Sequence, residues 1–135
     1  MKISIKDSLT IEEIKDQFSK KFPYLKIEFF TKPHKKFTGS KKENMIPTDV
    51  TIGESRSVHS IGELIIDEHT KVAHLEKEML EKFGLFAQVF RRSGKVWIET
   101  TVTDDWTLEK QNTEAESFIK DIRENEDAYN REHLS

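Results

Sequence analysis

The side chains best suited to chemistry gather in residues 88–112, QVFRRSGKVWIETTVTDDWTLEKQN. Three cations surround a glycine, and two tryptophans lie on either side of a pair of adjacent aspartates. Guanidinium and ammonium groups bind phosphate or carboxylate, and indole rings offer large apolar contact areas. The candidate ligand-binding residues are therefore Arg91, Arg92, Lys95, Trp97, Asp104, Asp105 and Trp106.

Simpler structural roles account for the same residues. Adjacent aspartates cannot supply the separated carboxylates of a glycosidase, but they suit the positive N-terminal end of a helix. Arg91 and Arg92 point to opposite faces of a strand, so at most two of the three cations converge. We therefore favour a helix start and a solvated hairpin tip, and keep as an alternative a small-molecule enzyme with a site near Trp97 and Asp105.

A second basic cluster lies in the connection between residues 32 and 61. Lysine clusters contact phosphate backbones, so a nucleic-acid or phosphate-ligand binding module would use Lys35, Lys36, Lys41 and Lys42. The chain as a whole carries a net charge of −3, and its last segment, 104–135, has ten acids against four bases. Acidity argues against a broadly basic nucleic-acid binder, so this function is the alternative and a solvated loop is preferred.

The remaining chemistry of the sequence is sparse. Zero cysteines exclude disulfides, thiol catalysis and thiolate metal sites. His74 and Glu78 could share a zinc ion on one helix face, but no third ligand is evident, and a solvated helix face is favoured. Walker loops, dinucleotide-binding turns and serine–histidine–acid order are also missing. We expect no catalytic residue, no cofactor and no metal.

Two similar segments must position these residues. Residues 1–31 and 62–92 align without a gap at an offset of 61, and each predicts a strand, a helix and a second strand. A capping box at Thr10–Glu13 starts the first helix and Pro23 ends it, while Gly84 follows the second helix. Two tandem βαβ units predict an α+β fold, the ferredoxin-like split βαβ sandwich, with a mixed sheet of another order as the alternative.

The ungapped alignment also predicts which strand faces are covered. It equates Phe86 and Phe90 with Leu25 and Phe29, so these rings should pack beneath the two helices. Ser93-Gly94 predicts a two-residue turn into a strand at 95–103, with Phe90 opposite Trp97. The aliphatic face of this hairpin then needs a second cover.

A C-terminal helix over residues 107–130 would provide that cover. Its narrow apolar stripe comprises Leu108, Ala115, Phe118, Ile119, Ile122 and Tyr129. So thin a stripe makes a stable helix only when it is docked, either on its own sheet or on a second copy. We expect a binding or self-associating protein, with the hairpin and this helix as a homodimer contact.

The organisation is that of one domain over 1–135, with a lysine-rich connection at 32–61 in which DVTI (49–52) could form a short extra strand. No run of 18 apolar residues and no signal-peptide core is present, so we expect a cytoplasmic protein without membrane contact. The run at 88–112 resembles one shared by small uncharacterised bacterial proteins. That resemblance implies a bacterial cytoplasmic origin and no particular activity.

Overall fold

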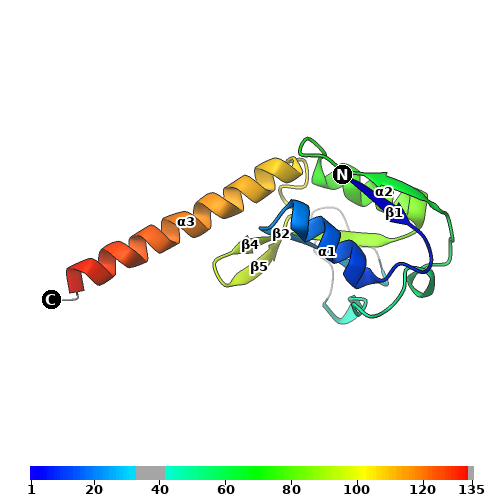
Figure 1. Ribbon diagram of the computed structural model, residues 1–135, viewed down its shortest axis with the longest axis horizontal. Coiled ribbons are helices and arrows are strands. Elements are labelled where there is room, and N and C mark those ends of the chain that lie inside the picture. Colours follow the sequence, from blue (N-terminus) through cyan, green and yellow to red (C-terminus); the bar gives the residue numbers. More distant parts are fainter. Residues whose placement is uncertain (33–41, 134–135) are drawn as a thin grey trace.

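The computed structural model describes residues 1–32 and 42–133, which form an α+β structure (Figure 1). Five strands and three α-helices follow one another along the described chain. In order they are β1 (Lys2–Ile5), α1 (Ile11–Lys21), β2 (Leu25–Phe30), β3 (Gly62–Ile65), α2 (Val72–Phe83), β4 (Phe86–Ser93), β5 (Val96–Glu99) and α3 (Leu108–His133). Two short 3₁₀ helices, η1 (Lys42–Asn44) and η2 (Gly53–Ser55), lie in the connection between β2 and β3.

The strands form two antiparallel sheets instead of one. β1 pairs with β3 in a two-stranded sheet, and β2, β4 and β5 form a three-stranded sheet in that order. The two strands of each strand–helix–strand segment therefore lie in different sheets, and each pairs with its counterpart from the other segment. The ferredoxin-like sandwich is not confirmed, whereas the predicted order of strands and helices is.

The ends of the first two helices follow the predicted chemistry. Thr10 is the N-cap of α1, and its hydroxyl accepts a hydrogen bond from the Glu13 amide at 3.2 Å. Gly84 ends α2 in the left-handed conformation with φ of +66°, and its amide donates to the Leu80 carbonyl. One apolar face of each helix is buried in a shared core, whereas Leu80 of α2 is 43% exposed.

The second strands present different faces to that core than the ungapped alignment predicts. Leu85, Ala87 and Val89 join the core beside Leu25, Ile27 and Phe29, whereas Phe86 is only half-buried. Two residues separate Phe22 from Leu25, but Gly84 alone separates Phe83 from Leu85. A shift of one residue turns every side chain of a strand to the other face. The prediction that Phe86 and Phe90 pack beneath the two helices was therefore wrong.

The hairpin register also differs from the prediction. Ser93 pairs with Val96 and Arg92 with Trp97, so the turn is Gly94-Lys95 and Phe90 faces Glu99. Gly94 has φ of +61°, a backbone conformation that favours glycine, which places it inside the turn. The strand predicted at 49–52 is a single bridge between Thr51 and Thr10.

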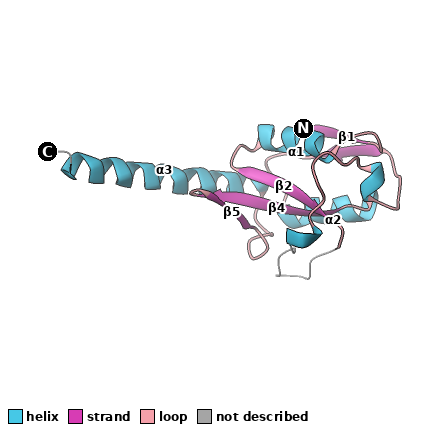
Figure 2. Ribbon diagram, turned by 90° about the horizontal axis from the view of Figure 1, so that it is seen from below, coloured by secondary structure: helices cyan, strands magenta, loops and turns pink. Residues whose placement is uncertain are grey.

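The helix α3 extends far beyond the rest of the molecule. Its 26 residues span about 39 Å, and Figures 1 and 2 show its first half beside the β4–β5 hairpin and its second half projecting as an arm. Leu108, Gln111 and Ala115 are buried, while every described side chain from 123 to 131 except Ala128 is exposed. The predicted helix at 107–130 is confirmed, and its first half docks on its own sheet.

Candidate functional site

Arg91 and Trp106 lie on the side of the hairpin that α3 covers. The Arg91 guanidinium donates to the Gln111 side chain at 3.0 Å and lies 5.6 Å from the centre of the Trp106 ring. Lys110 contacts the same ring from 4.2 Å. Arg91 is therefore held by α3 and by the segment that leads into it, and Lys110 is a residue of α3 itself.

Arg92 and Trp97 lie on the opposite face of the hairpin strands, and Arg92, close to the hairpin tip, also reaches a cleft beside α3. They are directly paired across β4 and β5, and the Arg92 guanidinium lies 5.7 Å from the centre of the Trp97 ring. Lys26 of β2 contacts both Trp97 and Phe90 at 5.2 Å, and burial lowers the pKa of Lys26. The two tryptophans thus belong to two separate groups of contacts, one on each face of the sheet.

Asp104 and Asp105 lie in the connection between β5 and α3, whose backbone carbonyls contact the start of α2. The carbonyls of Asp104 and Trp106 accept hydrogen bonds from the amides of Ala73 and Val72, the first residues of α2. Thr107 caps α3 instead, because its hydroxyl accepts from the Lys110 amide at 3.1 Å. The predicted helix start is confirmed, but its cap is Thr107 and neither aspartate.

The same arrangement occurs at the start of α1. The amides of Glu12 and Ile11 donate to the carbonyls of Thr48 and Val50. The segments TDVTI (48–52) and DDWTL (104–108) therefore perform one task in the two halves, which is to satisfy the first free amides of a helix. This role requires no ligand, and it belongs to the backbone carbonyl of Asp104 and not to either aspartate side chain.

The lysine cluster of the nucleic-acid alternative lies mostly outside the described residues. Lys35, Lys36 and Lys41 fall there, and Lys42 is exposed at the start of η1. On α2, His74 lies 3.5 Å from Glu78, which also pairs with Lys82 at 2.7 Å. In residues 1–32 and 42–133, no three His, Asp or Glu side chains are grouped so that they could hold a metal ion.

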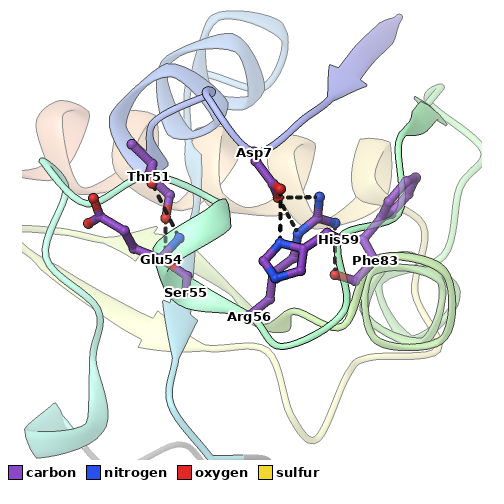
Figure 3. A network of polar contacts seen from close by, with 7 residues as sticks. All are labelled: Asp7, Thr51, Glu54, Ser55, Arg56, His59 and Phe83. Carbon is purple, nitrogen blue, oxygen red and sulfur yellow. Dashed lines mark hydrogen bonds and ion pairs between the residues drawn. The ribbon is translucent and has the colours of Figure 1, made fainter.

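A polar network that the sequence did not predict joins three segments around Arg56 (Figure 3). The Arg56 side chain is fully buried, and its Nε and Nη2 donate to Asp7 Oδ1 at 3.2 and 2.9 Å. Its Nη1 donates to the Phe83 carbonyl at the end of α2, at 3.1 Å. His59 Nδ1 lies 2.9 Å from the other Asp7 oxygen, and the Arg56 and His59 side chains lower the pKa of Asp7.

The contacts of this network indicate a structural role. A carboxylate that orients a histidine ring is one part of a general-base arrangement, which also needs a nucleophile at the other ring nitrogen. In the described part of the chain, His59 Nε2 has no such partner. The guanidinium instead ties the β1–α1 turn and the segment after η2 to the end of α2. No pattern in 53–60 marks Arg56 for this role.

A second buried polar group lies in the centre of the larger sheet. Glu28 and Gln88 are cross-strand partners, almost wholly buried, and Glu28 forms an ion pair with Lys15 of α1. Burial lowers the pKa of Lys15. The only sequence signal for this group is a glutamate inside the apolar strand LKIEFF.

No protein family model, curated protein or solved structure matches the chain. No helix in the described ranges has both the length and the apolarity that a membrane span requires.

Proposed function

We propose that this protein is a self-associating binding protein, in which two copies join through the hairpin and α3. The observation that carries the proposal is the open edge of β5 beside exposed apolar side chains. We call Val96, Ile98, Trp106 and Phe118 the hairpin–helix surface. Val96, Ile98 and Phe118 are 59%, 36% and 49% exposed.

The members of the hairpin–helix surface are neighbours. Ile98, Trp106 and Phe118 line one groove of about 210 Å³ between the hairpin and α3. Val96 lies two residues before Ile98 in β5 and so shares its face. Exposed apolar groups that are contiguous favour a protein contact, whereas scattered ones do not.

The backbone of β5 offers hydrogen bonds to a partner strand. β5 is the last strand of its sheet, whereas the outer side of β2 is paired with residues 44–46. The Thr100 amide donates to Val89 of β4, so by alternation the amides of Trp97 and Glu99 point away from β4. An identical antiparallel strand could accept from these amides across a two-fold axis.

The charges of the two elements favour a second copy as this partner. The hairpin tip carries Arg91, Arg92 and Lys95 without an acid, and none of the three forms an ion pair with another described residue. The projecting part of α3 is acidic, with Asp121, Glu124, Glu126 and Asp127 against Arg123 and Arg131. A two-fold pair brings the acidic arm of each copy toward the basic hairpin of the other.

Sedimentation equilibrium of two lysine variants tests the proposal. Ile98→Lys places a charge at the centre of the hairpin–helix surface and should reduce the mass from dimer to monomer. Ile65→Lys is the matched control, because Ile65 is also an exposed isoleucine on a strand but lies in the smaller sheet. A wild-type monomer at all concentrations, or equal loss of dimer in both variants, would contradict the proposal.

A further inference from the structure

A concave site lies on the other flank of α3, away from the hairpin–helix surface. It has a volume of about 330 Å³ and is enclosed by α3, the hairpin tip and the connection between α1 and β2. We call it the α3 cleft and define it by Tyr24, Arg92, Lys95, Ile119, Ile122 and Arg123. Small-molecule sites commonly begin at about 300 Å³, so the cleft can hold one small ligand.

Positive charge dominates the cleft. Arg92, Lys95 and Arg123 line it, while Glu126 is its one acidic lining residue. Arg92 is held in place, because its Nε donates to the Gly94 carbonyl at 3.1 Å and its guanidinium lies 5.7 Å from the Trp97 ring centre. No ion pair between described residues neutralises Arg92, Lys95 or Arg123. These groups are free to bind an anion.

The rest of the lining is apolar and fixed to the sheet. Ile119 and Ile122 are half-buried on α3. The Tyr24 amide donates to the Asn112 side chain at 2.9 Å, and the Tyr24 carbonyl accepts from the Arg92 amide at 2.9 Å. Tyr24 thereby links β4 to α3, and the cleft is formed before any ligand enters.

We propose that the α3 cleft binds a small organic phosphate with an apolar or aromatic body. A phosphate monoester carries about −1.5 to −2 charges at pH 7, which matches three cations and one acid. Two arginines can hold its oxygens through paired N–H donors, while the isoleucines and Tyr24 contact the body. The α3 cleft shares Arg92 and Lys95 with the basic hairpin of the proposed dimer contact, but none of the hairpin–helix surface residues Val96, Ile98, Trp106 and Phe118 lines it.

Titration of the full chain with phenyl phosphate tests this assignment by calorimetry and by amide and methyl NMR. Binding should shift the signals of Gly94, Ile119 and Ile122, and phenol and inorganic phosphate should each bind more weakly, since each has only half of the recognised features. Arg123→Gln should raise the dissociation constant at least about tenfold. Arg131→Gln, at an exposed α3 position outside the cleft, should leave it unchanged.

Three results would overturn the assignment. They are unchanged NMR signals at millimolar phenyl phosphate, equal weakening by the two arginine variants, and binding of phenol as tight as that of phenyl phosphate. Because Arg123 is exposed on a helix, its replacement by glutamine should preserve the fold. The same NMR spectra check that it does.

Discussion

Arg56 is the residue on which the packing of three segments depends. Its guanidinium is enclosed completely and donates to both a carboxylate and a helix-terminal carbonyl. Such a group is stabilising only while its partners are present, because a buried charge without partners is costly. The half-exposed Asp7 and the Phe83 carbonyl lose their shared donor when Arg56 is replaced.

Replacement of Arg56 by methionine should lower the free energy of unfolding by about 2–4 kcal/mol. Methionine fills much of the space but donates no hydrogen bond. Urea unfolding followed by circular dichroism measures the change. Arg131→Met, at an exposed position on α3, is the control and should change stability by less than about 0.5 kcal/mol. An unchanged midpoint for Arg56→Met would show that the network contributes nothing to stability.

The pH dependence of stability should report Asp7. Its folded pKa lies below its ordinary value of 3.8, first because of Arg56 and then because of His59. The carboxylate therefore stabilises the fold above pH 3.8, and this contribution is lost as the pH falls through the lower, folded pKa. Stability measured from about pH 5 downward should fall less steeply in Asp7→Asn than in the wild type.

Asp49→Asn is the matched control for that pH series. Asp49 is exposed and has no polar contact with another described residue. Its replacement should leave the slope of stability against pH as it is in the wild type. Equal slopes for the wild type and Asp7→Asn would contradict the assigned role of Asp7.

At the scale of elements, the lengths of the connections determine which strand faces enter the core, whereas the helices and their ends follow from local residues. Helix starts, helix ends and the long C-terminal helix follow from capping residues and periodicity, and the structure confirms them. The faces of β4 could not be predicted, because they depend on whether one or two residues follow a phenylalanine at a helix end. Gly84 makes the shorter connection possible through its left-handed backbone.

Replacement of Gly84 by alanine should therefore destabilise the protein by about 1–2 kcal/mol. Alanine at this position would have to adopt the disfavoured φ of +66°. Its Cβ would also lie 3.3 Å from Val58 Cβ. Gly94→Ala is the informative comparison, since Gly94 has a similar φ but its nearest neighbour, Ile122, is 3.9 Å away. Thermal unfolding should show the larger loss for Gly84→Ala, and a larger loss for Gly94→Ala would be inconsistent with this view of the connection.

The candidate sites show the same limit of sequence reasoning. The cluster of cations and tryptophans in 88–112 is visible as a pattern, but its division between two faces depends on the hairpin register. The network of Asp7, Arg56 and His59 joins residues that are 49 and 52 positions apart. No local periodicity reports such contacts, so they become evident only when the chain is folded.

At the scale of the whole molecule, the asymmetry of the surfaces suggests how the protein works. At one end, the two sheets pack with α1 and α2 around a common core. At the other end, the tip of the β4–β5 hairpin and the second half of α3 extend away from that core (Figure 1). A helix of polar composition gains little from an isolated apolar stripe. A second copy would cover the exposed Phe118 of that stripe, extend the sheet at β5 and match acidic arms with basic hairpins.

Hydrogen exchange at the edge of β5 tests this central claim most directly. The amides of Trp97 and Glu99 point away from β4, so in a monomer they face solvent and exchange rapidly. If two copies pair through β5, these amides should become protected as the protein concentration rises, and Ile98→Lys should remove the protection. Rapid exchange of both amides at every concentration, while the amides of Val96 and Ile98 stay protected, would contradict pairing through β5.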